Sequence, residues 1–400
     1  MLESYRRIFT RSTALFSLTG LVARLPISMV GLGLVLLAQH ATGSYAFAGT
    51  VSAVALIANA VLAIGQGRLI DRLGQGRVLP AVITVWGVGL AATMWSLEAD
   101  WPRWTTYVLA GVAGAALPSV GTCVRARWSS TLDDPARLHT AFSFEAVADE
   151  VVFLVGPIMV TMLATAVHPV AGLTAALVTG LAGTYAFAAQ RGSEPPAHAR
   201  PAHGTARAPM PWTAVAPLTV LCLALGALFG AAEVATVAFS DEQGHQGVAG
   251  FLLATWAFGS LVAGLVSGAI SWRSGPLVRL RWGALGMAAA MAPLALVPSI
   301  PVMFAVLLVG GFAISPTLIA AMSLAEQVLP PARLTEGMAF LQTGIAAGLA
   351  PGAALAGVVI DDAGASPAYL VSFAGGAVAL LAALATRVSA AVPQRARVAP

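Results

Sequence analysis

The chain has 400 residues, of which 58% are hydrophobic and only 10% are charged, and its formal net charge is +4. A soluble domain carries about 25% charged residues because its surface faces water, so this composition excludes a soluble globular protein and indicates an integral membrane protein. All 21 of the Lys and Arg residues are arginine. Without lysine the chain has neither a P-loop lysine for nucleotide phosphates nor a Schiff-base lysine, which disfavours an ATP-driven pump.

Twelve apolar segments are long enough to cross a membrane, since a helix needs about 20 predominantly apolar residues to span the hydrocarbon layer. They cover residues 12–39, 45–66, 79–97, 104–124, 140–166, 170–190, 213–239, 247–270, 282–300, 301–324, 336–360 and 367–387. The arginines before the first segment resemble the start of a signal peptide. The apolar run that follows is too long for a cleaved signal, so we predict a retained first helix.

Arginine gathers on one side of the predicted membrane. With the amino terminus in the cytoplasm, 19 of the 21 arginines lie in or beside cytoplasmic segments, Arg103 lies outside, and Arg24 lies within a span. Cytoplasmic loops carry the excess of basic residues, so this bias predicts that both termini are cytoplasmic. We expect a multi-pass protein of the cell membrane that contacts the lipid bilayer and functions as a monomer.

The spans divide into two equal groups. Residues 191–212 are rich in Pro, Ala and Arg, and they predict a disordered cytoplasmic linker between bundles at 1–190 and 213–400. Segments 134–157 and 330–353 share the sequence PARL at an offset of 196 residues. A second pair, GRLIDRLG and GAISWRSG, aligns at an offset of 201. Two matches at nearly one offset indicate a tandem duplication of a six-helix unit.

The loop between the second and third spans carries a motif. The sequence GRLIDRLGQGRV, from Gly67 to Val78, resembles the G-x-L-a-D-r-x-G-r-k motif of the major facilitator superfamily. Twelve spans, a central linker and a degenerate second copy of the motif agree with that family. The resemblance implies an all-α membrane protein with 12 transmembrane helices in two pseudo-repeated six-helix bundles, which moves a small-molecule substrate by alternating access.

The same resemblance implies that this loop is a cytoplasmic gate between the bundles. The gate residues are Gly67, Asp71, Arg72, Gly74 and Arg77. The glycines permit a tight turn and close helix approach, and Asp71 can accept hydrogen bonds from arginine or from the first amides of a helix. The alternative is that the arginines only orient the loop and bind anionic headgroups. Gln75 and Gly76 depart from the pattern, which has basic residues there.

Charged residues within the spans need partners or a function, because a charge at the bilayer centre costs about 2.5–3.5 kcal/mol. Arg24 lies in the first span, and Glu145, Asp149 and Glu150 lie in the fifth. The helical rise places Arg24 and Asp149 at similar depth, so we predict that they pair. Glu145 either joins this pair or joins the cytoplasmic arginines. One cation against three carboxylates leaves negative charge that a proton would relieve, which predicts Asp149 or Glu150 as a proton-coupling acid.

Three further residues in the spans are candidates for function. Glu233 in the seventh span either extends to the membrane interface or faces a cavity. Gly156 and Pro157 resemble the end of the family's antiporter motif, although Val152 replaces a motif glycine, and Pro157 predicts a helix bend. The fourth span lacks the mid-helix arginine of the family's drug–proton antiporters, for which Arg24 could substitute.

These observations predict a proton-coupled transporter that exports a small amphiphilic compound by antiport. The spans offer few polar groups to bind sugars or phosphates. Uptake of a metabolite by symport or uniport is the first alternative, and a membrane sensor or scaffold that does not transport is the second. Neither an enzymatic activity nor a metal, a cofactor or a nucleic-acid partner is expected, because no nucleophile–base set, metal-ligand spacing or cofactor motif occurs.

Overall fold

The computed structural model describes residues 8–196, 210–269, 272–330 and 333–387, and every regular element in these ranges is helical. The N-terminal half contains α2 (Arg11–Thr42), α3 (Tyr45–Leu73), α4 (Gln75–Glu98), α5 (Arg103–Ala116), α6 (Val120–Thr131), α7 (Pro135–Ala166), α8 (Ala171–Ala189) and η1 (Arg191–Ser193). The C-terminal half contains α9 (Trp212–Glu242), η2 (Gln246–Val248), α10 (Ala249–Ala269), α11 (Pro276–Met291), η3 (Leu294–Leu296), α12 (Ile300–Gly311), α13 (Ile314–Val328), α14 (Leu334–Ala363) and α15 (Ala365–Ala385). Most of the predicted linker lies outside the described residues.

Within the described residues, eleven helical segments are long and apolar enough to cross a membrane. The exception among the twelve predicted spans is the ninth, because α11 has only 16 residues. Pro276 begins this helix, at a position where a missing N–H costs nothing. Pro293 lies just beyond the end of α11 at Met291, and a helix cannot continue normally through proline. The predicted boundaries of 282–300 are therefore wrong.

Two predicted spans are each built from two helices. The fourth span breaks after Ala116, because Leu117 is extended ahead of Pro118. The chain then resumes as α6, which runs to Thr131, beyond the predicted end of the span at residue 124. The tenth span breaks between α12 and α13 at Phe312. Because α6 extends to Thr131, Arg125 lies on a helix and not in a loop.

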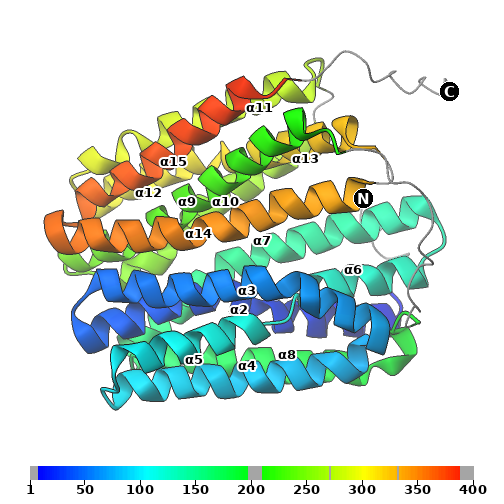
Figure 1. Cartoon of the computed structure of the whole chain (residues 1–400), viewed down its shortest axis with the longest axis horizontal. Coiled ribbons are helices and arrows are strands. Elements are labelled where there is room, and N and C mark those ends of the chain that lie inside the picture. Colours follow the sequence, from blue (N-terminus) through cyan, green and yellow to red (C-terminus); the bar gives the residue numbers. More distant parts are fainter. Residues whose placement is uncertain (1–7, 197–209, 270–271, 331–332, 388–400) are drawn as a thin grey trace.

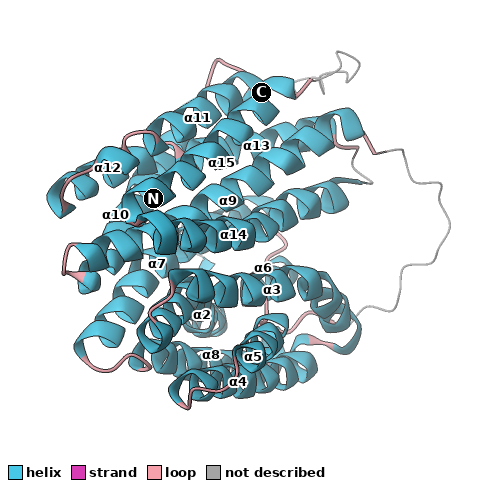
Figure 2. Cartoon of the chain, turned by 60° about the vertical axis from the view of Figure 1, so that its left-hand side comes forward, coloured by secondary structure: helices cyan, strands magenta, loops and turns pink. Residues whose placement is uncertain are grey.

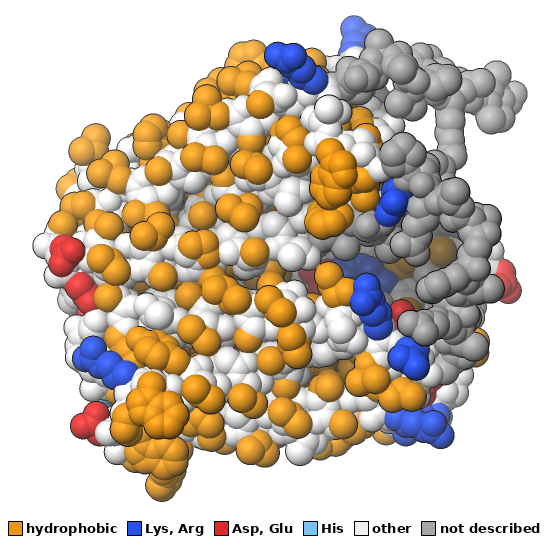
Figure 3. All heavy atoms as spheres, in the orientation of Figure 1, with side chains coloured by type: hydrophobic (Ala, Val, Ile, Leu, Met, Phe, Trp, Pro, Cys, Tyr) orange, Lys and Arg blue, Asp and Glu red, His pale blue; other side chains and the backbone are white. Residues whose placement is uncertain are grey.

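The helices of the N-terminal half lie together, and those of the C-terminal half lie beside them (Figures 1 and 2). We call the end at which α8 ends and α9 begins the linker end, and the opposite end the far end. On the face drawn in Figure 3, hydrophobic side chains cover the broad middle band and charged side chains lie toward the two ends. A membrane protein needs such a surface, since lipid tails contact its middle and water its ends. The division into bundles at 1–190 and 213–400 stays a prediction.

Helices α9 and α14 approach each other unusually closely, because glycines line their contact. A Cβ atom on Gly348 would lie 1.9 Å from the carbonyl oxygen of Leu223, and one on Gly230 would lie 2.0 Å from that of Leu349. Any side chain at these positions would therefore collide with backbone. Small residues of this kind drive helix association in membranes, where lipid offers no hydrophobic force between helices.

A Gly348→Val variant should destabilise the C-terminal half, since its side chain would force α9 and α14 apart. Overpacking of a core costs about 1–3 kcal/mol. Thermal unfolding in detergent can be followed with a thiol-reactive dye, because Cys123 and Cys222 are buried and free. The matched control is Gly65→Val, since a Cβ there meets nothing within 4 Å. Equal unfolding midpoints for the two variants would contradict the prediction.

Candidate functional site

A buried cluster of charged side chains joins α2 to α7. Arg24 Nη1 lies 2.7 Å from Asp149 Oδ1, and Arg24 Nη2 lies 2.5 Å from Glu145 Oε2. Arg24 Nε donates to the carbonyl of Gly20 at 3.1 Å. The two carboxylates lie one helical turn apart on α7, so they share a face and one guanidinium reaches both. The predicted pairing of Arg24 with Asp149 is present, and Glu145 joins it.

A second arginine neutralises the cluster. Arg125, from α6, places Nη2 2.5 Å from Asp149 Oδ2. Two guanidinium groups therefore face these two carboxylates, and of the three acids predicted to carry excess negative charge only Glu150 has no cation among the described residues. The sequence analysis missed Arg125 because it ended the fourth span at residue 124, whereas α6 continues to Thr131. Arg125 lies on α6, the second helix of the fourth span, and the substitution of Arg24 for a mid-helix arginine stays a prediction.

Glu145 is fully buried and accepts hydrogen bonds from three side chains. Its side chain has 0% exposure, and it accepts hydrogen bonds from Ser17 Oγ at 2.6 Å and Trp128 Nε1 at 2.8 Å as well as from Arg24. Charge-assisted bonds of this kind are about twice as strong as neutral ones. Trp128 also packs edge-on against Phe16, with ring centroids 4.9 Å apart. Glu145 therefore fixes α2, α6 and α7 relative to one another, and the alternative that it joins other arginines is not realised.

Asp149 and Arg125 differ from Glu145 in their access to solvent. The side chain of Asp149 is 33% exposed and that of Arg125 is 37% exposed, whereas Arg24 is only 5% exposed. The cluster thus has a buried part that holds the helices and an accessible part that can meet water or a bound molecule. An ion pair with one accessible side can exchange partners without burying an unpaired charge.

Two acidic residues of the spans are not neutralised. Within the described residues, neither Glu150 nor Glu233 has a hydrogen bond or an ion pair. Glu150 follows Asp149 on α7 and points about 100° away from it. A Cβ atom on Gly31 of α2 would lie 3.5 Å from Glu233 Oε1 and 3.6 Å from Ser52 Oγ of α3. Glu233 therefore points toward the other half of the protein, and its cavity-facing role stays a prediction.

The halves are held together at the far end by two aspartates. Asp361, near the end of α14, accepts hydrogen bonds from Ser44 Oγ at 2.6 Å and from the backbone N–H groups of Tyr45 at 2.8 Å and Ala46 at 2.9 Å. These groups form the amino terminus of α3, where a carboxylate is favoured by the unpaired amides and the helix dipole. Asp241 accepts from Tyr45 Oη at 2.9 Å. We call these bonds the far-end contact.

Backbone packing reinforces the far-end contact. A Cβ atom on Gly49 of α3 would lie 2.5 Å from the carbonyl oxygen of Ala353, and one on Gly357 of α14 would lie 2.3 Å from that of Tyr45. A Cβ atom on Gly250 of α10 would lie 2.3 Å from the carbonyl oxygen of Pro157. Two pairs of helices, α3 with α14 and α7 with α10, are therefore in direct backbone contact toward this end.

The charged residues of the predicted gate have no partners within the described residues. Asp71, Arg72 and Arg77 are exposed, and within the described residues none of them forms a hydrogen bond or an ion pair. Gly74 has φ +90°, a conformation that favours glycine, and it ends α3. A Cβ atom on Gly67 would meet nothing within 4 Å, so no close helix approach requires glycine there.

Gln75 and Gly76, which depart from the family motif, form hydrogen bonds with residues outside the loop. Gln75 Oε1 accepts from Arg127 Nε at 2.8 Å, and the N–H of Gly76 donates to Glu194 Oε1 at 2.9 Å. Arg191 Nη2 donates to the carbonyl of Gly76 at 2.7 Å. The start of the linker is therefore attached to the loop, which sequence reasoning did not find because Glu194 lay in a segment predicted to be disordered.

The remaining predicted residues, Gly156 and Pro157, lie inside α7, which is helical throughout. A Cβ atom on Gly156 would lie 2.0 Å from Ser28 Oγ, so glycine is needed for α2 to pass. Ser28 Oγ donates to the carbonyl of Val152 at 2.8 Å. The predicted bend at Pro157 stays a prediction. No group of residues that could hold a metal ion occurs in the described part of the chain.

Comparisons with known proteins identify a family. The model of the Major Facilitator Superfamily matches residues 16–309 and again residues 234–399. No curated protein matches the chain in sequence. Among solved structures, an auto-inhibited peptide transporter of the POT family shares 14% identity, with 94% of this chain and 96% of that chain covered and a TM-score of 0.72.

Two structures of a bacterial homologue of the iron transporter ferroportin are also similar. The inward-facing structure gives a TM-score of 0.68 at 14% identity, with 94% of this chain and 99% of that chain covered. The outward-facing structure with soaked iron gives a TM-score of 0.60 at 15% identity, with the same 94% and 99% covered. At these identities the likeness concerns the fold.

An Arg24→Leu variant should unfold more readily, because it leaves Glu145 buried without its cation. Breaking a buried pair costs about 3–5 kcal/mol. The thiol-reactive unfolding assay measures this, with Arg68→Leu as control because Arg68 is exposed. The double variant Arg24→Leu, Glu145→Gln should recover part of the loss. An unfolding midpoint for Arg24→Leu equal to that of the control would contradict a stabilising role for the cluster.

Proposed function

We propose that this chain, which belongs to the major facilitator superfamily, is a proton-coupled secondary transporter that exports a small amphiphilic compound by antiport. Membership of the family makes it a transporter and not an enzyme. Alternating access then requires a substrate site between the halves, one closed end at a time, and a group that links the motion to the ion gradient.

The observation that carries proton coupling is that Glu150 and Glu233 lie in the spans without a cation. An ionised carboxylate without a partner is unfavourable in a medium of low dielectric constant, so such a group binds a proton when water is withdrawn from it. Asp149 and Glu145, in contrast, are paired with Arg24 and Arg125. The proposed coupling group is therefore Glu150 or Glu233, and Asp149 becomes the weaker candidate.

The position of Glu233 suits coupling to motion. It extends from α9 toward Gly31 of α2 and Ser52 of α3, so at least these two neighbours belong to the other half of the protein. When the halves separate at the far end, these neighbours withdraw and water can replace them. The carboxyl group would then lose a proton more easily than in the present packing. Protonation and the opening of the far end are linked in this way.

The present conformation corresponds to a transporter that is closed at the far end. The far-end contact joins the halves there, and the exposed Asp71, Arg72 and Arg77 leave the proposed gate unlatched at the linker end. The higher TM-score with the inward-facing ferroportin homologue than with the outward-facing one supports this assignment. If the linker end is cytoplasmic, as the arginine bias predicts, this conformation opens to the cytoplasm.

An amphiphilic substrate is supported by the distribution of polarity. The spans are mostly apolar, and the accessible part of the charged cluster, Asp149 with Arg125, offers one polar anchor. A site with an apolar lining and one polar group selects a molecule with an apolar body and a polar or charged end. Sugars and phosphorylated compounds need many more hydrogen-bonding partners than this.

Proteoliposomes with an imposed pH gradient test the coupling. Glu150→Gln, Glu233→Gln and Asp149→Asn are compared with wild type over a panel of amphiphilic compounds, with Glu98→Gln as control because Glu98 is exposed. A variant of the coupling acid should lose gradient-driven transport by about tenfold or more while it retains exchange of substrate without a gradient.

The results distinguish proton-coupled export from uptake and from a sensor or scaffold. Full gradient-driven transport in all three variants would eliminate proton coupling through these acids. Accumulation of the compound in cells, in place of its exclusion, would favour uptake by symport. A wild-type protein that moves neither protons nor any compound of the panel would support a sensor or scaffold.

The far-end contact makes a separate prediction. Asp361→Asn should weaken the closed far end, because a neutral amide binds the amino terminus of α3 less strongly than a carboxylate. A cysteine at position 52, where Ser52 is buried, should then react several-fold faster with a membrane-impermeant maleimide added from the far side. Asp362→Asn is the matched control, since within the described residues Asp362 has no partner. Equal labelling rates for both variants would show that Asp361 does not hold the halves.

A further inference from the structure

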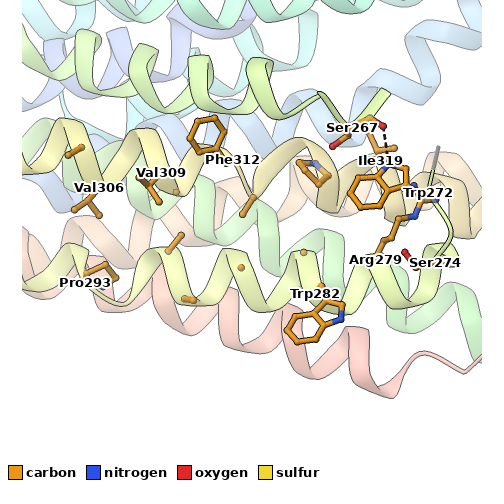
Figure 4. A pocket seen from close by; sticks show the side chains of 18 residues that line it. Ser267, Trp272, Ser274, Arg279, Trp282, Pro293, Val306, Val309, Phe312 and Ile319 are labelled. Atoms are coloured by element: carbon orange, nitrogen blue, oxygen red, sulfur yellow. Dashed lines mark hydrogen bonds between the residues drawn. The ribbon is translucent and has the colours of Figure 1, made fainter. Parts of the chain in front are cut away.

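A groove on the outer face of the C-terminal half lies away from the charged cluster. It has a volume of about 870 Å³ and runs between α10, α11, α12 and α13. Figure 4 shows Trp272, Ser274 and Arg279 together at one end of the groove, and Pro293 and Val306 at the other. Its volume is within the usual range of about 300–1,000 Å³ for ligand sites in proteins.

The sequence explains why the groove exists. Small residues on α11, including Gly286 and Ala290, face small residues on the broken tenth span, including Gly310 and Ala313. A Cβ atom on Gly286 would lie 3.3 Å from Cβ of Ala313, and one on Gly310 would lie 3.3 Å from Cβ of Ala290. These residues form an apolar floor that no large side chain covers.

The groove opens laterally toward lipid. The residues on its rim include Trp282, which is 69% exposed, and Val309, which is 67% exposed. From Arg279 to Pro293 the helical rise gives a length of about 20 Å, which exceeds the half-thickness of about 15 Å of a bilayer's hydrocarbon core. An acyl chain of one leaflet therefore fits along the groove from end to end.

The linker end of the groove carries an unsatisfied cation. Arg279 forms no hydrogen bond or ion pair within the described residues, and its Nε atom is buried without a partner. Its guanidinium lies 5.6 Å from the ring centroid of Trp272, whose own Nε1 donates to the carbonyl of Ser267 at 2.9 Å. Arg279 also stands in the first turn of α11, where the helix dipole disfavours a cation and favours an anion.

The nearby Arg281, in contrast to Arg279, has hydrogen-bond acceptors for its guanidinium group. Arg281 Nε is directed at the carbonyl of Ala383 and Nη2 at those of Leu384 and Thr386, each at 3.4 Å. Arg279 has no such acceptors and faces the groove. A phosphate group would supply acceptors for its free donors and balance its charge, with the Ser274 hydroxyl beside it.

We propose that the groove between α11 and α13 binds an anionic phospholipid, with its phosphate at Arg279 and one acyl chain on the small-residue floor. Charge complementarity selects the headgroup, and the lateral opening selects a lipid over a water-soluble anion. At 16 residues, α11 is too short to cross the hydrocarbon layer by itself. The bound acyl chain would fill the apolar space beside it. This site is independent of the proposed proton coupling.

Native mass spectrometry of the full chain in detergent tests the proposal, with phosphatidylglycerol and phosphatidylcholine added separately. Wild type should retain phosphatidylglycerol with about tenfold higher affinity, because the choline cation of phosphatidylcholine offsets its phosphate charge and is repelled by Arg279, whereas phosphatidylglycerol keeps a net negative charge. Arg279→Gln should abolish the preference. Arg273→Gln is the matched control, since Arg273 is an exposed arginine outside the groove and should keep the preference.

The apolar part of the site has its own variants. Ala289→Trp and Ala305→Trp fill the groove from opposite walls and should each lower the affinity for both lipids several-fold. Two variants keep the test decisive if one of them fails to fold. Inorganic phosphate should not displace the lipid at equal concentration. The proposal is overturned by an unchanged preference in Arg279→Gln, by unchanged lipid affinity in the folded tryptophan variants, or by displacement with phosphate alone.

Discussion

The requirement that buried charges be paired governs the N-terminal half of this protein. Arg24 and Arg125 together neutralise Glu145 and Asp149, and the four side chains tie α2, α6 and α7 into one unit. In an apolar interior an unpaired ion costs several kcal/mol, whereas a fully hydrogen-bonded pair is close to neutral. The cluster therefore lets four charged groups lie among the helices without an unpaired charge.

The two halves solve the same packing problem by different chemistry. The residues of α14 that align with Glu145, Asp149 and Glu150 are Leu341, Ile345 and Ala346. There α14 meets α9 through backbone: a Cβ atom on Gly226 would lie 2.1 Å from the carbonyl oxygen of Ile345. One half thus uses ion pairs and the other uses glycine contacts at equivalent places. The glycine contact has no titratable group, so any response to protons at this position belongs to the N-terminal half.

Most of the fold could be predicted from the sequence, because span length, apolar composition and the positions of arginine are local properties. The pairing of Arg24 with Asp149 also followed from depth along a helix. Arg125 was missed because the end of a span cannot be located from apolarity alone when a helix continues into polar sequence. The contact of Glu194 with Gly76 and the role of Asp361 depend on segments distant in the chain, which no local pattern contains.

Exposure to water distinguishes the bonds of Asp361 from those of Glu145. Asp361 is exposed although it accepts three hydrogen bonds, so water can replace its partners when the halves separate. The net contribution of each such bond is about 0.5–1.5 kcal/mol, and a two-state equilibrium reverses from 1:99 to 99:1 with about 5.5 kcal/mol. The free energy of a few such bonds is therefore of the size that a reversible contact between the halves requires. Glu145 has 0% exposure, so breaking its bonds would leave a buried ion with nothing to replace them, and the helices that Glu145 joins should stay together if the far end opens.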